Sequence, residues 1–351
     1  MKLQYLRLRQ FRNYEEISIP FFPDLNVIWG KNAQGKTNLV EAIYLLMMGR
    51  SFRTSKLQDL PSWGKDSFYL ELAFTKNGIS QNLSLSVTPE IKKICYNNTI
   101  CRSSSSLFGI LPGIFMPPDD DLVKGSPLFR RQFLDTIIAQ SDPLYLHHLF
   151  RYIRALKQRN HLLKTNSMPG IEEWEEILSH SAVYLVSKRR LSVKKLEKQV
   201  QQIYPLLSGE TNLFEVHYST KAPSCGDDIK QYYKDLFRTT REKDFKFGIS
   251  SVGPHRDEMM ISFENKDLRT FGSEGQKRTG VASLRLAAWH LLKEELDISP
   301  IMIIDDLDAS LDKERRDRFI DYTHNLGQVF ITSTETPAHR GIPIEDGKIL
   351  S

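Results

Sequence analysis

The order of apolar and polar residues near the start of the chain predicts a strand, a glycine loop and a helix. Residues 3–11 carry apolar side chains at strand-like spacing, and residues 24–29 form a short apolar run that ends at Gly30. Residues 39–47 then place apolar side chains on one face of a helix. Residues 67–97 suit short strands separated by turn signals, so we expect an antiparallel sheet beside this strand–loop–helix unit.

The middle of the chain reads as helical, whereas its last part returns to a mixed pattern. Residues 127–165 and 170–207 each place apolar side chains at regular intervals between charged ones. The loop between them contains proline and glycine, so a helical hairpin is expected. Other apolar runs predict strands at residues 213–218, 259–263, 300–304 and 328–332.

Composition places the chain among ordinary globular proteins and excludes several classes. Of 351 residues, 40% are hydrophobic and 26% charged, and the net charge of +5 is compatible with a polyanionic partner without requiring one. Cys95, Cys101 and Cys225 lack zinc-binding spacing and predict a reduced intracellular protein. The chain begins without the apolar core of a signal peptide, and no segment is apolar enough to span a bilayer. We therefore expect a cytoplasmic location and no membrane partner.

Residues 30–37 (GKNAQGKT) match the phosphate-binding pattern G-x-x-x-x-G-K-[ST], between a predicted strand and a predicted helix. The glycines permit a tight backbone whose N–H groups converge on phosphate oxygens at a helix N-terminus. Lys36 would place its ammonium near the β and γ phosphates, and the Thr37 hydroxyl would bind Mg²⁺. The residues expected to bind ATP here are Gly30, Lys31, Asn32, Ala33, Gln34, Gly35, Lys36, Thr37 and Asn38.

Two adjacent carboxylates, Asp305 and Asp306, follow the apolar run at residues 300–304. On its own this pattern is equally consistent with an acidic turn after a core strand. In a chain that also carries a phosphate loop, we expect Asp305 to bind Mg²⁺ opposite Thr37 and Asp306 to orient or polarise the attacking water. Lys36 and Asp306 are thus the predicted catalytic residues. The two motifs lie about 270 residues apart, which is typical of an ABC or SMC ATPase head that is interrupted by an insertion.

A third motif, Ser273-Glu274-Gly275-Gln276, fits the S-x-G-Q pattern that begins a helix in ABC and SMC ATPases. In those proteins this helix N-terminus completes the nucleotide site of a second subunit. We therefore expect Ser273, Gly275 and Gln276 to contact ATP bound to another copy of the chain. Ser273 also serves as an ordinary helix N-cap, and the two interpretations are compatible.

Over most of its length the sequence resembles the RecF family of bacterial DNA-repair proteins. The matching segments include GRSFRT, KGSPLFRR and GPHRD, which are not general ATPase motifs, and lie at residues 2–14, 32–46, 49–54, 122–135, 253–257, 272–279 and 328–334. The resemblance implies an α/β fold: an ABC/SMC-type P-loop ATPase head with an added antiparallel β subdomain and a mainly helical second lobe. It places the head at residues 1–115 and 264–351, and the helical arm at residues 116–263.

The resemblance also implies a function in DNA repair, DNA replication and the SOS response. Members of this family form ATP-dependent homodimers, bind gapped, single- or double-stranded DNA, and act with RecR and RecO in loading RecA. The expected ATPase is weak and DNA-stimulated, and slow hydrolysis resets the dimer. The alternative is a nucleotide-binding subunit of an ABC transporter, but that would require a glutamine loop and a histidine after the last strand, and neither is evident.

The sequence departs from the family pattern at a few positions. Ala33 replaces a glycine of the phosphate loop, which alanine tolerates if its φ stays negative. Ala309 lacks a hydroxyl expected to cross the dimer interface. Thr332 and Thr334 stand where ABC ATPases place a γ-phosphate-sensing histidine, and we assign that role to Thr334.

Part of the predicted arm, residues 130–198, carries an excess of positive charge at least as large as that of the whole chain. Between residues 130 and 198 there are 13 basic and 7 acidic side chains. No base-reading motif accompanies them, so we expect contacts to the phosphate backbone with strong salt dependence. Arg50 and Arg53 would contact either nucleotide or DNA. The arm residues predicted to bind DNA are Arg130, Arg131, Arg151, Arg154, Lys157, Arg189 and Arg190.

Overall fold

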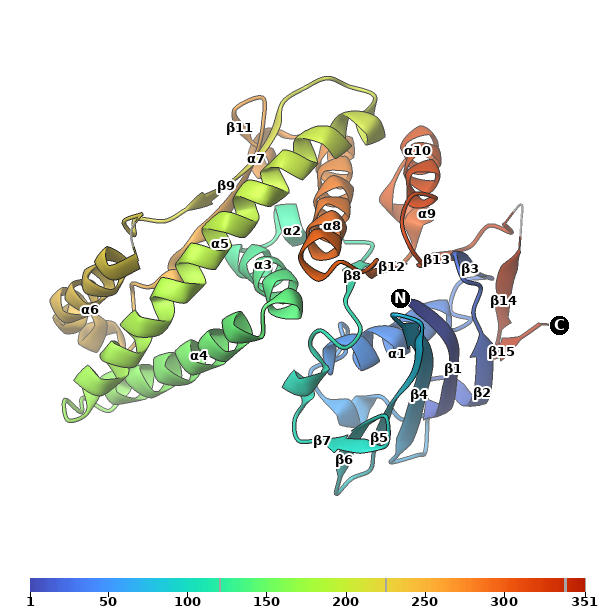
Figure 1. The fold of residues 1–351 in the computed structure, drawn as a ribbon, viewed down its shortest axis with the longest axis horizontal. Helices are drawn as coiled ribbons and strands as arrows, with labels where there is room; N and C mark the ends of the chain where they lie inside the picture. Colours follow the sequence, from blue (N-terminus) through green and yellow to red (C-terminus); the bar gives the residue numbers. More distant parts are fainter. Residues whose placement is uncertain (120, 225, 338–339, 351) are drawn as a thin grey trace. The chain divides into compact units, whose positions relative to one another are not determined.

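A computed structural model describes residues 1–119, 121–224, 226–337 and 340–350, apart from the side chains of residues 226, 227, 309 and 310 (Figure 1). Cys225 and the side chain of Ala309 therefore lie outside the described part. The chain forms two compact units: residues 1–120, 206–209 and 274–351 make the first, and residues 121–205 and 210–273 make the second. The predicted division at residues 115 and 263 differs from these bounds, because the short hairpin and helix at residues 258–271 pack within the second unit.

The first unit is built around a six-stranded sheet in the order β15-β14-β3-β13-β12-β8. Five of its strands run parallel, and β15 pairs antiparallel at one edge. Parallel strands place their carboxyl ends at one edge of a sheet, so the loops after β3 and β12 meet there. The strands are β3 (Leu25–Trp29), β8 (Gly113–Met116), β12 (Ile301–Ile304), β13 (Val329–Ser333), β14 (Gly341–Glu345) and β15 (Lys348–Ile349).

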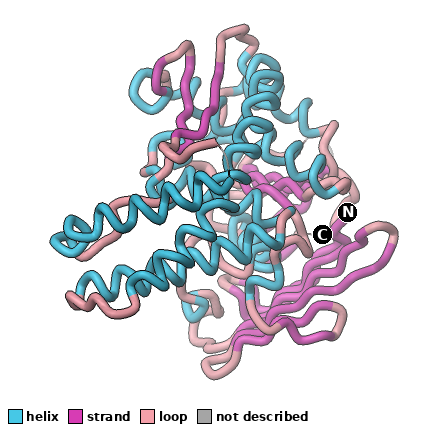
Figure 2. The backbone as a smooth tube through the Cα atoms, turned by 60° about the vertical axis from the view of Figure 1, so that its left-hand side comes forward, coloured by secondary structure: helices cyan, strands magenta, loops and turns pink. Residues whose placement is uncertain are grey.

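An antiparallel sheet in the order β2-β1-β4-β5-β6-β7 forms the predicted β subdomain. Figure 2 shows its long strands side by side in magenta. Alternate residues of β1 and β4, such as Leu6, Leu8, Leu70 and Leu72, face a core that the two sheets share with helix α1. Its strands are β1 (Lys2–Phe11), β2 (Tyr14–Pro20), β4 (Phe68–Lys76), β5 (Ile79–Val87), β6 (Lys92–Tyr96) and β7 (Thr99–Cys101).

Helix α1 is apolar around most of its circumference, and residues 39–48 are all buried. Buried Gln328 joins the two sheets, because its amide accepts a hydrogen bond from the Leu3 backbone N–H and donates to the carbonyls of Leu3 and Phe22. The helices of this unit are α1 (Lys36–Met48), η1 (Leu57–Asp59), η2 (Ser104–Leu107), α8 (Glu274–Leu296), α9 (Leu307–Ser310) and α10 (Lys313–Thr323).

The second unit is mainly helical, and its small sheet has the order β11-β10-β9. Helices α4 and α5 form the predicted hairpin (Figure 1). The stretch predicted as helical at residues 127–165 is divided into two helices, α3 and α4, because Pro143 begins a new helix. Helix α6 was not predicted. The elements are α2 (Asp121–Lys124), α3 (Pro127–Ser141), α4 (Pro143–Lys164), α5 (Ile171–Ser208), β9 (Phe214–Ser219), α6 (Gly226–Phe247), η3 (Pro254–Arg256), β10 (Glu258–Phe263), β11 (Lys266–Asp267) and α7 (Leu268–Phe271).

None of the helices in the described part of the chain has the length and apolar character needed to cross a bilayer.

Candidate nucleotide site

The loop between β3 and α1 has the backbone that a phosphate cradle needs. Gly30 and Gly35 have φ values of 151° and 111°. A Cβ atom on Gly30 would lie 2.3 Å from the carbonyl oxygen of Ile344, and one on Gly35 would lie 2.6 Å from the Asn13 amide. Glycine is therefore required at both positions, and the loop leads directly into the N-terminus of α1, where backbone N–H groups attract anions.

Ala33 does not satisfy the condition under which we expected it to be tolerated. Its φ is +66°, which is the left-handed region, whereas the expectation was a negative value. The tight turn of the loop sets this angle regardless of the side chain. An alanine there is strained by about 1–2 kcal/mol, since its Cβ approaches the backbone.

Lys36 folds back over the loop that precedes it. Its Nζ donates to the carbonyl oxygens of Gly30 and Lys31 at 2.6 and 2.9 Å. Burial lowers the pKa of Lys36, and the carboxylates of Asp306 and Asp305 oppose that shift. An ammonium held mainly by carbonyl oxygens at the mouth of an amide-lined loop fits a phosphate group.

The predicted metal ligands come together, although 268 positions separate them. The Thr37 hydroxyl donates to Asp305 Oδ1 at 3.0 Å, and the Thr332 hydroxyl donates to the same oxygen at 2.7 Å. Burial raises the pKa of Asp305, whereas the hydrogen bonds from Thr332 and Thr37 oppose the shift. A buried carboxylate beside a hydroxyl fits a small divalent cation. No cluster of three or more His, Cys, Asp or Glu ligands occurs in the described residues, so phosphate and water oxygens would supply the remaining ligands.

Asp306 follows β12 in a left-handed backbone conformation, with a φ of 52° and a ψ of 61°. Its backbone N–H donates to the Thr332 hydroxyl at 2.7 Å. Thr334, which we expected to sense the γ phosphate, instead donates to Asp308 through its N–H and its hydroxyl. Thr332 is thus the threonine that lies at the carboxylate pair. The γ-phosphate-sensing role expected of Thr334 stays a prediction.

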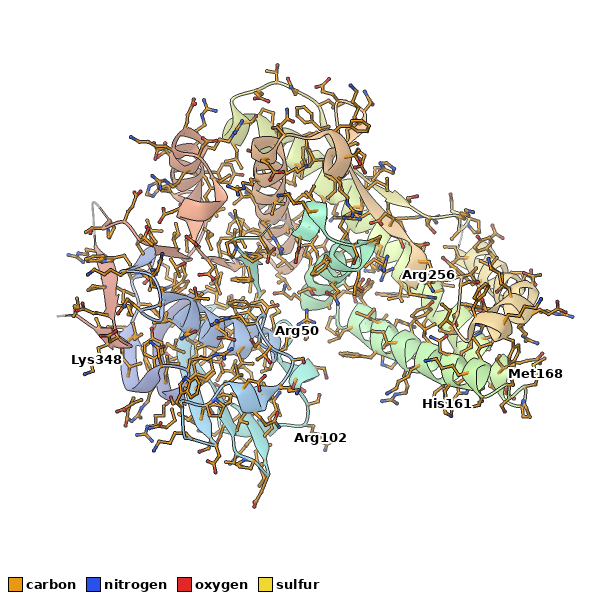
Figure 3. The ribbon with its side chains drawn as sticks, turned by 180° about the vertical axis from the view of Figure 1, so that it is seen from behind. Arg50, Arg102, His161, Met168, Arg256 and Lys348 are labelled. Carbon is orange, nitrogen blue, oxygen red and sulfur yellow. The ribbon has the colours of Figure 1, made fainter. Side chains whose placement is uncertain are left out.

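One cavity of about 610 Å³ brings the phosphate loop and the carboxylates together within the first unit. This volume lies in the range of small-molecule sites. Sequence reasoning missed the prolines and the phenylalanine that line it. Arg53 lines it as well, whereas Arg50 is exposed after the end of α1 and does not (Figure 3). The lining residues are Asn32, Ala33, Gln34, Gly35, Lys36, Thr37, Asn38, Phe52, Arg53, Pro117, Pro118, Asp119, Asp305, Asp306 and Thr332.

Behind the loop, sequence reasoning missed a buried carboxylate, Glu41 of α1. Its side chain is fully buried and accepts two hydrogen bonds from Arg12, at 2.9 and 2.8 Å, and one from the Ser51 hydroxyl. Arg53 lies 3.7 Å from the same carboxylate and donates to Asn38 at 2.7 Å. An acidic residue inside an otherwise apolar helix was the available signal, because a buried charge requires a partner.

The S-x-G-Q motif lies at the start of α8. Ser273 is exposed and immediately precedes the first helical residue, Glu274, as an N-cap position requires. A Cβ on Gly275 would lie 2.4 Å from the guanidinium of Arg315, so the end of that arginine side chain would have to shift to admit a larger residue. Ser273, Gly275 and Gln276 are absent from the lining of the cavity, and their contact with ATP stays a prediction about a second copy.

Two arginines predicted to bind DNA are interior residues of the second unit. Arg130 pairs with Glu258 at 2.8 Å and donates to backbone carbonyls, and Arg189 pairs with Asp135 at 2.8 Å. Both are at least 92% buried, so they are unavailable to DNA and the prediction for them is wrong. Arg131 donates to the Asp257 carbonyl.

Arg190 is also engaged, since it donates to the carbonyls of Ala222 and Pro223. Arg151, Arg154 and Lys157, in contrast, are exposed along α4. His161 and Met168 mark the far end of the α4–α5 hairpin in Figure 3.

The GPHRD segment connects several elements of the second unit. His255 lies 2.7 Å from the Tyr152 hydroxyl of α4, and Asp257 accepts a 2.6 Å hydrogen bond from Tyr218 of β9. The Pro254 carbonyl accepts from Arg189 of α5. Burial lowers the pKa of His255 to about 4. The segment therefore connects α4, α5 and β9 through hydrogen bonds in the interior of the second unit. Because its pKa is about 4, His255 is neutral near pH 7.

Comparison with known proteins agrees with this architecture. A family model described as the RecF/RecN/SMC N terminal domain matches residues 2–342. The DNA replication and repair protein RecF of Protochlamydia amoebophila is 45% identical over 95% of this chain and 94% of its own length. That of Chlamydia muridarum is 38% identical over 97% of this chain and 94% of its own length.

Solved structures of a RecF protein and of an SMC head also match this chain. A structure of the recombination mediator protein RecF with ATP, in the RecFOR pathway, superimposes with a TM-score of 0.91 at 28% identity, covering 99% of this chain and 96% of the other. An SMC head bound to the C-winged helix domain of ScpA matches with a TM-score of 0.59 at 16% identity, covering 100% and 97%, which is a likeness of fold. The chain therefore belongs to the RecF family, within the RecF/RecN/SMC proteins.

Proposed function

We propose that this protein binds Mg²⁺ and ATP in the cavity of its first unit and uses slow hydrolysis as a switch in DNA replication and recombinational repair. The observation that carries the proposal is that the hydroxyls of Thr37, in the phosphate loop, and Thr332 both donate to one carboxyl oxygen of Asp305. Relatives that align over nearly the whole chain are DNA replication and repair proteins, and one related structure contains ATP.

Different residues of the cavity would bind the phosphates, bind the cation and orient the attacking water. The N–H groups at the start of α1 and the ammonium of Lys36 hold phosphate oxygens, and Thr37 with Asp305 holds the cation. Bound Mg²⁺ would neutralise part of the negative charge of the phosphates. Asp306, at the wall of the same cavity, orients the attacking water, and its backbone is fixed by Thr332.

The separate position of the S-x-G-Q motif supports an ATP-dependent homodimer. Ser273 lies outside the set of residues that line the cavity of its own chain, as expected of a residue that completes the site of a second copy. Dimerisation on ATP would bury one nucleotide between the loop of one protomer and the α8 N-terminus of its partner. Hydrolysis then releases the dimer.

DNA binding by the helical unit is supported by the charge of α4. That helix contains no Asp or Glu, and its exposed positions include Arg151, Arg154 and Lys157. Such a surface contacts phosphates of gapped, single- or double-stranded DNA irrespective of sequence. Because related structures are described as belonging to the RecFOR pathway, we propose that RecO and RecR act with this protein in loading RecA.

Light scattering and a DNA titration test this function. With Mg·ATP the mass should double at micromolar protein, whereas ADP or no nucleotide should leave a monomer. Fluorescence anisotropy with gapped duplex DNA should then report tighter binding with ATP than with ADP. A protein that stays monomeric with ATP, or binds DNA equally in all three states, would contradict the switch.

A further inference from the structure

Asp308 lies in the short helix α9, two residues after the proposed catalytic carboxylate of Asp306. It is absent from the lining of the nucleotide cavity, so any effect on the reaction passes through other residues. Only 18% of its side chain is exposed, so most of the charged carboxylate is shielded from water. A carboxylate in such a position requires partners that replace the lost hydration.

The end of strand β13 supplies most of these partners. One carboxyl oxygen of Asp308, Oδ2, accepts from the Ser333 hydroxyl at 2.8 Å, from the Thr334 backbone N–H at 2.9 Å and from the Thr334 hydroxyl at 3.2 Å. The Ser333 hydroxyl in turn accepts from the Glu335 backbone N–H at 3.0 Å. Residues 333–335 are thereby attached to α9, although 25 positions separate Asp308 from Ser333.

An ion pair with helix α10 holds the same carboxylate from a second direction. Arg316 Nη1 donates to Oδ1 of Asp308 at 2.9 Å and lies 3.2 Å from a carboxyl oxygen of Glu335. The Glu335 side chain is 65% exposed, so its pair is screened by solvent. The Arg316 and Asp308 side chains are only 16% and 18% exposed. Asp308 therefore joins α9 both to α10 and to the end of β13.

Asp306 lies between two attachments to the end of β13. On one side its own backbone N–H donates to the Thr332 hydroxyl at 2.7 Å. On the other side Asp308 accepts from Ser333 and Thr334. The backbone of Asp306 is left-handed, with a φ of 52°. Such a conformation is unfavourable for a residue other than glycine and persists only where surrounding contacts enforce it.

We propose that Asp308 is a positioning residue for ATP hydrolysis. Through its bonds to residues 333–334 and to Arg316, it holds α9 so that the carboxylate of Asp306 faces the attacking water. The role rests on the proposed function, because it concerns the hydrolysis step. Misplacement of a catalytic group raises the energy of the transition state and leaves the bound substrate unaffected, so it lowers kcat at constant ATP affinity.

Separate measurements of ATP affinity and turnover test this role. Asp308→Ala removes every hydrogen bond that the carboxylate accepts. It should lower kcat about ten-fold or more and leave the calorimetric Kd for Mg·ATP within about two-fold of the wild-type value. Asp308→Asn keeps an oxygen for Ser333 and Thr334, so it should retain most of the turnover. Asp317→Ala removes an exposed carboxylate of α10 and is the matched control, with wild-type kcat and Kd.

Two further measurements separate positioning from folding and from dimerisation. Circular dichroism melting establishes that Asp308→Ala is folded at the assay temperature, and light scattering should give it the wild-type mass with Mg·ATP. Ser333→Ala removes one hydrogen bond and leaves the ion pair in place, so it tests the same contact even if Asp308→Ala does not fold. It should lower kcat about three-fold. Added to Asp308→Ala, it should cause no further loss, because both side chains act through one contact.

The outcomes distinguish this role from the function on which it rests. Wild-type kcat in folded Asp308→Ala, or in Ser333→Ala, would overturn the role and leave the proposed function intact. A Kd that rises as much as kcat falls, or a loss of dimerisation, would also overturn it, because Asp308 would then act on binding or assembly. A wild-type protein that binds Mg·ATP without hydrolysing it would refute the proposed function, and the role of Asp308 with it.

Discussion

Replacement of Glu41 by glutamine tests how strongly the phosphate-loop helix depends on one buried ion pair. Glu41→Gln keeps the shape of the side chain but removes the charge and turns an NH₂ group toward Arg12. Breaking a buried pair by changing one partner costs about 3–5 kcal/mol. We expect the lower value, about 3 kcal/mol, because 19% of the Arg12 side chain is exposed and Arg12 still donates to the Asp59 carbonyl.

Thermal unfolding followed by circular dichroism measures this loss. The first unit has about 200 residues, so 3 kcal/mol corresponds to a Tm about 6–12 °C lower. Glu16→Gln is the matched control in the same unit, because the Glu16 side chain is 57% exposed and its pairs with Arg7 and Arg9 are solvent-screened. It should leave Tm essentially unchanged.

A double variant distinguishes charge from packing. Arg12→Met with Glu41→Gln removes both charges of the buried pair and leaves only Arg53, whose side chain is 47% exposed, without its acidic neighbour, so it should recover much of the Tm lost in Glu41→Gln alone. A Glu41→Gln protein that melts within about 2 °C of wild type would refute the reasoning. A double variant less stable than both single variants would do the same.

Four further predictions follow from the same structure. Lys36→Met should abolish ATP binding, whereas Asp306→Asn should keep binding and block phosphate release; normal hydrolysis by Asp306→Asn would disprove its assignment. Ala33→Gly should raise the free energy of unfolding by roughly 0.5–1 kcal/mol, since relief of the left-handed strain exceeds the entropy cost of glycine, and a lower urea midpoint would contradict this. Reversing Arg151, Arg154 and Lys157 to Glu should weaken DNA binding and reduce the salt slope by about 3, and unaltered affinity would move the DNA surface elsewhere. His255 has a folded pKa of about 4, below its ordinary value, so protonation favours the unfolded state; stability should be intact near pH 7 and fall as the pH drops from about 6.5 towards 4. The urea midpoint should depend less on pH across that range in His255→Gln than in the wild type. An equal dependence on pH in both proteins would exclude the histidine as the cause.

The phosphate loop and the carboxylate pair of the nucleotide site could be predicted from the sequence because each consists of residues that are close together in the chain. The glycines and Lys36 of the loop are adjacent in the chain, so their geometry follows from a few backbone angles. The sign of φ at Ala33 could not be predicted, because closure of the whole loop decides it. The meeting of Thr37 with Asp305 was predicted from the two motifs together, whereas the strand order that brings them together was not predicted.

Charge counting failed where burial decides the role of a charge. Arg130 and Arg189 were counted among the basic residues expected to bind DNA. Their carboxylate partners lie 128 and 54 positions away in the sequence and hold both arginines inside the second unit. Helix α6 was missed although Ile229, Tyr233 and Phe237 recur every four residues and are buried. Dense charges around them obscured that spacing.

The order of strands in the parallel sheet has a consequence for synthesis of the protein. Strand β3 leaves the ribosome roughly 300 residues before β13, the neighbour with which it pairs. At 5–20 residues per second this interval is roughly 15–60 s. The strands of the antiparallel sheet all lie within residues 2–101, so each of them has its partners early. Since Asp305 and Thr332 emerge near the end of synthesis, a nascent or prematurely terminated chain carries the phosphate loop and Thr37 without the carboxylate of Asp305. We therefore expect nucleotide loading to be restricted to finished molecules.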